Sequence, residues 1–390
     1  MNKDILKIIA KCMLYSSSGD LIGFSNGNLK FNKKINGILT NENENFIEES
    51  IEKTNETFLR FFNGGLVEGL KIKYFNYIYS YNTHINLIIC KNLLKYEKID
   101  DKINNIKKSL IDLYENDTLK NKRFYSDIFK NQIKKLKNKN YNYLDEPYEK
   151  NANSSDPATT SLILGIYYND NKNLNDLIYL CIHITRLTHN NGISILGSIC
   201  SALFTNFAFN KLEIKRWPFE LIKILESKNF RKIYLENTND ETKYLIDLKL
   251  YIYQWKKYIN LYLLEKNNEI FFKIDSDFLV DPYPGEALKV LWDNFTQDKT
   301  RFYPGDLGDD VMIICYHNLL NLKLINIKNT NNYYYDRLIG YSCYNSGNSS
   351  NLGMISSGIF SLNYTLEIIN NLISGIDNIN ILKEITNLIK

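Results

Sequence analysis

Apolar residues recur at the spacing of an α-helix along almost the whole chain, and this periodicity is the feature that most limits its fold. Alternating strand patterns are short and few, with Glu269–Lys273 as the best candidate. We therefore predict an all-α protein. The predicted helices cover Lys3–Ser16, Thr83–Lys95, Lys102–Tyr114, Pro157–Tyr168, Leu174–Leu187, Ile193–Phe209, Trp217–Ser227, Lys243–Leu264, Gly285–Phe295, Val311–Leu322 and Leu362–Ser374.

No linker and no internal repeat interrupts this pattern. A chain of 390 residues is long enough for two or three domains. Because no shift in composition divides it, we expect a single compact domain over residues 1–390. Within it, Asp156 and Pro157 are predicted as the N-cap and the first residue of a helix, and the Asn- and Gly-rich stretch Asn345–Gly353 as a loop.

The composition is that of an ordinary soluble globular protein, with 44% hydrophobic and 24% charged residues. A formal net charge of +4 is too small to indicate a nucleic-acid partner, and the basic residues are scattered. Their one local concentration, Lys130–Lys139, is predicted as a solvated helix face. We therefore expect no nucleic acid among the partners.

The sequence also indicates a cytoplasmic location without a membrane anchor. No signal peptide is recognisable, and the longest uncharged stretch, Thr188–Asn210, carries many polar residues. Such a stretch predicts a buried core helix preceded by a polar loop, not a membrane span. The six cysteines show no CxxC spacing, so they are expected to be small core residues in a reducing compartment: Cys12, Cys90, Cys181, Cys200, Cys315 and Cys343.

An acidic cluster, Tyr303-Pro-Gly-Asp-Leu-Gly-Asp-Asp-Val311, precedes an apolar run that begins at Met312. A Gly-rich turn here delivers the carboxylates of Asp306, Asp309 and Asp310 to the start of a predicted buried helix. Magnesium and similar hard cations need several oxygen ligands at tight geometry. The cluster is therefore a candidate metal site.

Four blocks, in order, resemble the ADP-ribosylglycohydrolase family, especially its ADP-ribosylarginine hydrolase branch. They are Ser16–Gly23 with Asn26–Phe31, then Ser80–Thr83, then Leu187–Thr205, and finally the acidic cluster from Gly305 onward. The resemblance spans roughly residues 5–325, and it implies an all-helical fold. It also implies a chemistry in which two magnesium ions polarise a ribose and orient a water for attack at its anomeric carbon.

The second block departs from the pattern that the resemblance implies. Its two metal-binding aspartates correspond to Tyr81 and Asn82 here. A neutral phenol and a neutral amide supply no carboxylate, so this half of the metal site should be weak or lost. Asn82 remains a candidate substrate contact. Thr83 keeps its hydroxyl, which either ligates a metal weakly or caps the following helix.

In the fourth block, Asp306 corresponds to the first aspartate of the family motif, which makes it the candidate catalytic and metal-binding residue. The second aspartate falls on Gly308, and Asp309 and Asp310 are displaced by one or two positions. Two interpretations stay open. Asp306 forms a single cation site with Asp309 or Asp310, or the last two complement the dipole of the following helix.

The remaining candidates concern the substrate. Ser154 and Ser155 stand where the family holds a pyrophosphate, but the carboxylate of Asp156 would repel a phosphate and could cap the helix itself. His189, in the Thr-His pair of the third block, either contacts substrate or is structural. Asp20, in the first block, is expected to make structural hydrogen bonds at a helix end.

These departures lead to two hypotheses of function. In the first, the chain is a pseudoenzyme that recognises ADP-ribose or an ADP-ribosylated protein, with magnesium binding and hydrolysis weak or lost. In the alternative, it is an active magnesium-dependent hydrolase that cleaves the N-glycosidic bond of ADP-ribosyl-arginine with an altered metal shell. Both are implied by the resemblance, and the missing acids at positions 81 and 82 separate them.

Overall fold

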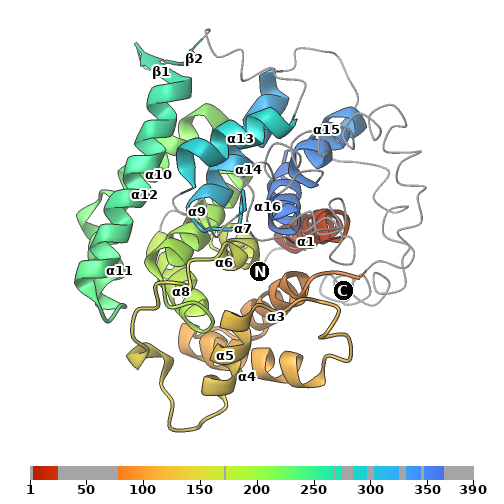
Figure 1. Ribbon diagram of the computed structural model, residues 1–390, viewed down its shortest axis with the longest axis vertical. Coiled ribbons are helices and arrows are strands. Elements are labelled where there is room, and N and C mark those ends of the chain that lie inside the picture. Colours follow the sequence, from red (N-terminus) through yellow and green to blue (C-terminus); the bar gives the residue numbers. More distant parts are fainter. Residues whose placement is uncertain are drawn as a thin grey trace, which may run out of the picture. The chain divides into compact units, whose positions relative to one another are not determined.

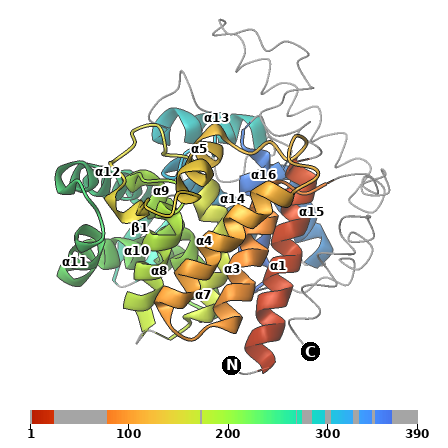
Figure 2. The same ribbon diagram turned by 90° about the horizontal axis from the view of Figure 1, so that it is seen from below.

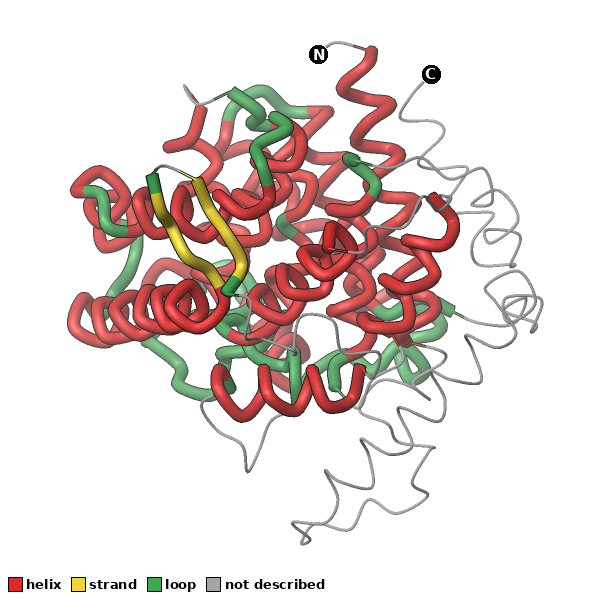
Figure 3. Tube along the Cα trace, turned by 90° about the horizontal axis from the view of Figure 1, so that it is seen from above, coloured by secondary structure: helices red, strands yellow, loops and turns green. Residues whose placement is uncertain are grey.

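A computed structural model describes residues 3–24, 78–170, 173–267, 269–273, 284–296, 303–324, 331–343 and 347–363. Helices make up most of this part of the chain (Figure 1). Its one sheet is the antiparallel pair of β1 (Leu263–Lys266) and β2 (Glu269–Phe272), which Figure 3 shows as the two yellow strands. The all-α prediction is confirmed, and so is the strand predicted near Glu269.

The described residues group into two compact units, each assembled from separate stretches of sequence. Unit 1 contains Met1–Thr83, Asp277–Asp306 and Ile313–Lys390, and unit 2 contains His84–Ser276 and Leu307–Met312. Two of the boundaries fall inside α3 (Tyr81–Lys95) and α14 (Asp310–Leu324), so each of these helices contributes residues to both units. A single domain over residues 1–390 stays a prediction.

In unit 1, α1 (Lys3–Phe24) and α16 (Ser349–Phe360) lie side by side (Figure 1). They approach so closely that a methyl group on Gly19 would lie 2.1 Å from the carbonyl oxygen of Gly353. A methyl group on Gly23 would lie 2.2 Å from the carbonyl oxygen of Ser349. Small residues are therefore required along this contact. The other helices of the unit are α13 (Pro284–Phe295) and α15 (Asn331–Cys343).

Unit 2 is built around α9 (Gly192–Phe209), against which α6, α7, α8 and α12 pack. This helix is long and apolar enough to cross a membrane, but 89% of it is buried among its neighbours, as predicted for a core helix. Figure 2 shows α10, α11 and α12 adjacent to one another. The helices of the unit are α4 (Ile99–Asn116), α5 (Asp127–Leu136), α6 (Asp156–Thr160), α7 (Leu162–Tyr167), α8 (Leu174–Arg186), α10 (Trp217–Leu225), α11 (Lys228–Glu236) and α12 (Glu241–Tyr262), with 3-10 turns at Tyr143–Asp145 and Ile214–Arg216.

Several predicted boundaries were wrong. The stretch Asn345–Gly353, predicted as a loop, contains the first residues of α16, because Asn348 acts as its N-cap. Asp156 is the first residue of α6 and not its N-cap, which is Ser155. The predicted helix Leu362–Ser374 lies almost wholly outside the described residues, as does the Asn26–Phe31 part of the first block. All six cysteines are buried, as expected.

Candidate functional site

Asp20, in unit 1, is a buried carboxylate that accepts hydrogen bonds from four neutral donors. Its Oδ2 receives the Ser80 amide at 3.1 Å, the Ser80 hydroxyl at 2.9 Å and the Thr83 hydroxyl at 2.6 Å. Its Oδ1 receives the Ser350 hydroxyl at 2.6 Å. These bonds stabilise the charge of a carboxylate removed from water. The predicted structural role of Asp20 is supported, and its partners come from two separate segments, the Ser80–Thr83 block and the start of α16.

The Ser80–Thr83 block begins α3. Ser80 caps the helix, because its hydroxyl accepts the Asn82 amide at 3.3 Å. We predicted the hydroxyl of Thr83 as a helix cap or a weak metal ligand. It donates a hydrogen bond to Asp20 instead, and the helix already begins at Tyr81, so the capping interpretation is wrong. Asn82 is fully buried, and its Nδ2 donates to Oδ1 of Asn351 at 3.0 Å.

Asn351 belongs to a run of buried polar residues, Asn348–Asn351, that our sequence reasoning missed as part of the site. Besides capping α16, Asn348 donates from Nδ2 to Oδ1 of Asp306 at 3.1 Å. Ser349 donates to the carbonyl oxygen of Gly23 at 2.7 Å. A helix start was signalled by an Asn ahead of the apolar residues from Leu352, but the Gly and Ser content of the stretch favoured a loop.

Asp306 ends a tight turn in unit 1. Its amide donates to the carbonyl oxygen of Tyr303 at 3.0 Å, and Gly305 has a φ of +74°. Pro followed by Gly at the two central positions is typical of a type II turn, whose third residue requires a positive φ. The side chain of Asp306 is partly exposed and therefore retains access to solvent.

Asp309 and Asp310, in unit 2, are fully buried at the start of α14. Asp310 Oδ1 accepts the Leu307 amide at 3.2 Å, and Asp309 Oδ1 accepts the Asp310 amide at 3.0 Å. Asp309 Oδ2 accepts a hydrogen bond from Nε2 of Gln254 at 3.0 Å. Both carboxylates satisfy backbone donors of the first turn, which supports the helix-start interpretation. Their use in a joint cation site with Asp306 stays a prediction.

A second buried acid, Asp247 of α12, was also missed. Its Oδ2 accepts the hydroxyl of Tyr148 at 3.0 Å. Burial raises its pKa from 3.8 to about 6, the bonds from Tyr148 and from the amide of Gly192 oppose this, and the negative charge of Asp309 adds to it. The pKa of Asp247 therefore lies well above the ordinary value for an aspartate. No motif marks it, because its surroundings come from distant segments.

The segment that was predicted to hold a pyrophosphate lies against the acidic cluster within unit 2. Ser154 forms an isolated antiparallel bridge with Leu307, and the Gly308 amide donates to the carbonyl oxygen of Asn153 at 3.0 Å. Gly308 in turn lies against α9, since a methyl group on it would lie 2.4 Å from the carbonyl oxygen of Ile193. The fold thus brings Ser154 and Ser155 together with the third and fourth blocks.

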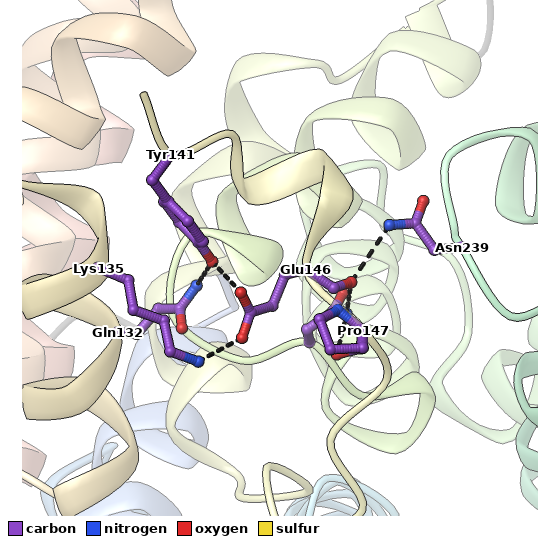
Figure 4. Close-up of polar contacts among 7 residues, drawn as sticks. Gln132, Lys135, Tyr141, Glu146, Pro147 and Asn239 are labelled. Carbon is purple, nitrogen blue, oxygen red and sulfur yellow. Dashed lines mark hydrogen bonds and ion pairs between the residues drawn. The ribbon is translucent and has the colours of Figure 1, made fainter. Parts of the chain in front are cut away.

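The loop before Ser154 is anchored by Glu146 (Figure 4). Lys135 and Tyr141 both donate to its carboxylate, and Gln132 donates to the hydroxyl of Tyr141 at 2.7 Å. The backbone oxygen of Glu146 accepts Nδ2 of Asn239 at 3.2 Å. These bonds fix the backbone a few residues upstream of the candidate site.

His189 contacts Ser154 directly. The Ser154 hydroxyl lies 3.2 Å from Nε2 of His189, and the Thr188 hydroxyl lies 2.8 Å from Nδ1. The Thr188 hydroxyl donates its proton to the carbonyl oxygen of Thr185, so its oxygen accepts a hydrogen bond from Nδ1 of His189. The other ring nitrogen, Nε2, then accepts a hydrogen bond from the Ser154 hydroxyl. Burial lowers the pKa of His189 to about 4, and the charge of Asp156 opposes this, so the imidazole is neutral at pH 7.

No family model matches the chain, but two proteins are similar to it in sequence. A protein of Acanthamoeba polyphaga mimivirus, provisionally named ADP-ribosyl glycohydrolase L444, is 28% identical over 97% of this chain and 68% of its own length. ADP-ribosylhydrolase ARH1 of Dictyostelium discoideum is 28% identical over 47% of this chain and 49% of its own length. Over almost its whole length, the chain is similar to a protein named as an ADP-ribosyl glycohydrolase. This chain spans about half the length of the Dictyostelium relative and two thirds of the viral one.

The resemblance implies magnesium, and the residues of this chain fit that metal unevenly. Tyr81 and Asn82 are buried and supply no charge, although magnesium prefers charged oxygens. Asp306, Asp309 and Asp310 do carry carboxylates. Within the described residues, no group of three or more His, Cys, Asp or Glu side chains is placed to hold a metal ion. The Ser80–Thr83 block therefore does not provide what a charged half-site requires.

Proposed function

We propose that this protein recognises ADP-ribose, or ADP-ribose attached to a protein, with hydrolysis and magnesium binding weak or lost. The observation that carries the proposal is the start of α3. There, Tyr81 and Asn82 stand in place of two carboxylates, and the amide of Asn82 is bonded to Asn351 at 3.0 Å. Without those charges, a second metal ion has little to hold it beside the first.

The Ser154–His189 pair supports recognition of the ligand. A neutral imidazole and two serine hydroxyls are hydrogen-bonding groups that suit the hydroxyls and phosphate oxygens of ADP-ribose. The charge of Asp156 disfavours a phosphate near its carboxylate, so we assign the contacts to Ser154, Ser155 and His189. The short helix α6 begins at Asp156, directly after them.

A second candidate is an active hydrolase with an altered metal shell. The buried carboxylates of Asp309 and Asp310 favour it, because they keep negative charge next to the Ser154 segment in unit 2. In that case, Asp306 would be needed for cleavage of the N-glycosidic bond of ADP-ribosyl-arginine.

An assay of ADP-ribose release from ADP-ribosyl-arginine, with and without magnesium, separates the candidates. Calorimetry with ADP-ribose on the same protein measures binding independently of turnover. We expect binding without turnover, and we expect His189→Ala to weaken binding roughly tenfold, the value of about one hydrogen bond. The exposed substitution Lys7→Ala is the matched control and should change neither quantity.

Magnesium-dependent turnover that Asp306→Asn abolishes would establish the active hydrolase instead. If the protein shows no binding and no turnover, both candidates are rejected, and a role in protein interaction is left.

A further inference from the structure

We propose that the first turn of α16 is a neutral clamp, formed by Asn348, Ser350 and Asn351, that holds the candidate metal segments of unit 1 together without magnesium. This clamp extends the proposed function. It rests on that proposal only for the identity of the ligand. Nothing in the family motifs includes these residues, because the clamp lies beyond the four blocks.

Each clamp residue bonds a different segment of unit 1. Asn351 accepts from Asn82 at the start of α3 at 3.0 Å. Ser350 donates to Asp20 of α1 at 2.6 Å. Asn348 donates to Asp306 at 3.1 Å, and its amide donates to the carbonyl oxygen of Pro304 at 2.8 Å. One helical turn thus connects the first block, the second block and the first aspartate of the fourth.

The clamp side chains are buried, so the bonds from Asn82 to Asn351 and from Ser350 to Asp20 are protected from exchange with water. Asn348 is 1% exposed, and Ser350 and Asn351 are fully buried. A hydrogen bond formed away from water is stronger, and its loss leaves polar groups without partners in an apolar setting. Asn351 and Asn82 are both neutral, so they meet without the repulsion that two carboxylates would bring.

The position of the clamp is fixed by the close contact of α16 with α1. Because Gly19 and Gly23 have no side chain, the backbone of α16 lies directly against them. Gly353 lies against Gly19, and Ser349 lies against Gly23. The position of the clamp is therefore set by packing that involves no ligand. In a metal centre, a cation attracts carboxylates from separate segments, whereas here neutral amides and a hydroxyl make the same connections.

The clamp predicts that the stability of the protein does not depend on magnesium. The measurement is the thermal unfolding midpoint of the full chain in EDTA and in millimolar magnesium chloride. For the wild type, we expect the same midpoint in both. Asn351→Leu should lower it by roughly 5 °C in both solutions, since it removes a buried bond to Asn82. The matched control is Asn363→Ala, an exposed Asn beyond the other end of α16, which should have no effect.

A charge-restored variant tests the converse. Tyr81→Asp combined with Asn82→Asp returns both carboxylates, and we expect this protein to be less stable than the wild type in EDTA and to recover with magnesium. If Asn351→Leu yields no folded protein, Asn348→Ala replaces it, because that bond joins the partly exposed Asp306. It should lower the midpoint by a few degrees.

Two results would overturn the clamp. One is a wild-type midpoint that falls in EDTA and returns with magnesium, and the other is a midpoint unchanged by Asn351→Leu or, if that variant does not fold, by Asn348→Ala. Neither measurement includes ADP-ribose, so the clamp and the proposed ligand fail separately. If the thermal midpoints are as expected but the protein does not bind ADP-ribose, the clamp is supported and the assignment of the ligand is rejected.

Discussion

Gln254 donates a hydrogen bond from Nε2 to Oδ2 of Asp309 at 3.0 Å, and both side chains are buried in unit 2. Asp309 belongs to the acidic cluster that first suggested a metal site. The bond ties this carboxylate to α12, a helix that contributes none of the family blocks.

Replacing Gln254 should therefore destabilise the protein. Gln254→Leu removes one of the donors to a buried carboxylate, and a hydrogen bond to a charged group is worth about 1.5–3 kcal/mol. We expect a loss of roughly 2 kcal/mol in the free energy of unfolding, measured by denaturant titration. In a double-mutant cycle with Asp309→Asn, most of this loss should disappear, and additive effects of the two substitutions would contradict the assignment.

Asp247 should make stability depend on pH. Its folded-state pKa of about 6 lies above its ordinary value of 3.8, so the folded state binds the proton more tightly. Its contribution to stability is then present at low pH and is lost as the pH rises from about 4 to about 6, by roughly 3 kcal/mol. Asp247→Asn should remove this dependence in unfolding titrations across that range. The exposed substitution Glu97→Gln should leave the dependence unchanged.

His189 should act in the opposite direction. Its pKa falls from 6.5 to about 4 in the folded state, so protons bind more readily to the unfolded chain. The protein should lose about 3 kcal/mol of stability from this group as the pH falls from about 6.5 to about 4. His189→Gln should flatten that part of the profile. An equally steep loss in the variant would show that His189 is not the group responsible.

The contact between α1 and α16 should not tolerate a methyl group. Gly19→Ala would place a carbon 2.1 Å from the carbonyl oxygen of Gly353, which is backbone and cannot rotate away. Overpacking of this kind costs about 1–3 kcal/mol, and a backbone clash should cost at least the upper value. A thermal or denaturant melt measures it, with the exposed α1 substitution Lys7→Ala as the control. Stability equal to that of the wild type would mean that the helices are further apart.

Much of the fold follows from periodicity, and the errors have physical reasons. The helix predicted over Leu174–Leu187 is observed at Leu174–Arg186, because a strong apolar face repeats through it. The start of α16 was predicted as a loop, since Gly and Ser favour turns in isolation. Small residues are needed there because α16 contacts α1, and the residues that meet are more than 300 positions apart along the chain.

Residue identities alone were enough to predict that this chain is helical, that it resembles the ADP-ribosylglycohydrolase family, and that positions 81 and 82 lack carboxylates, because periodicity and charge are properties of the residues. The partners of the remaining polar groups became known from the folded arrangement. Asp20 accepts hydrogen bonds from four donors, Asn82 donates to Asn351, and Gln254 donates to Asp309. A hydrogen bond depends on the distance between two atoms, and packing sets that distance.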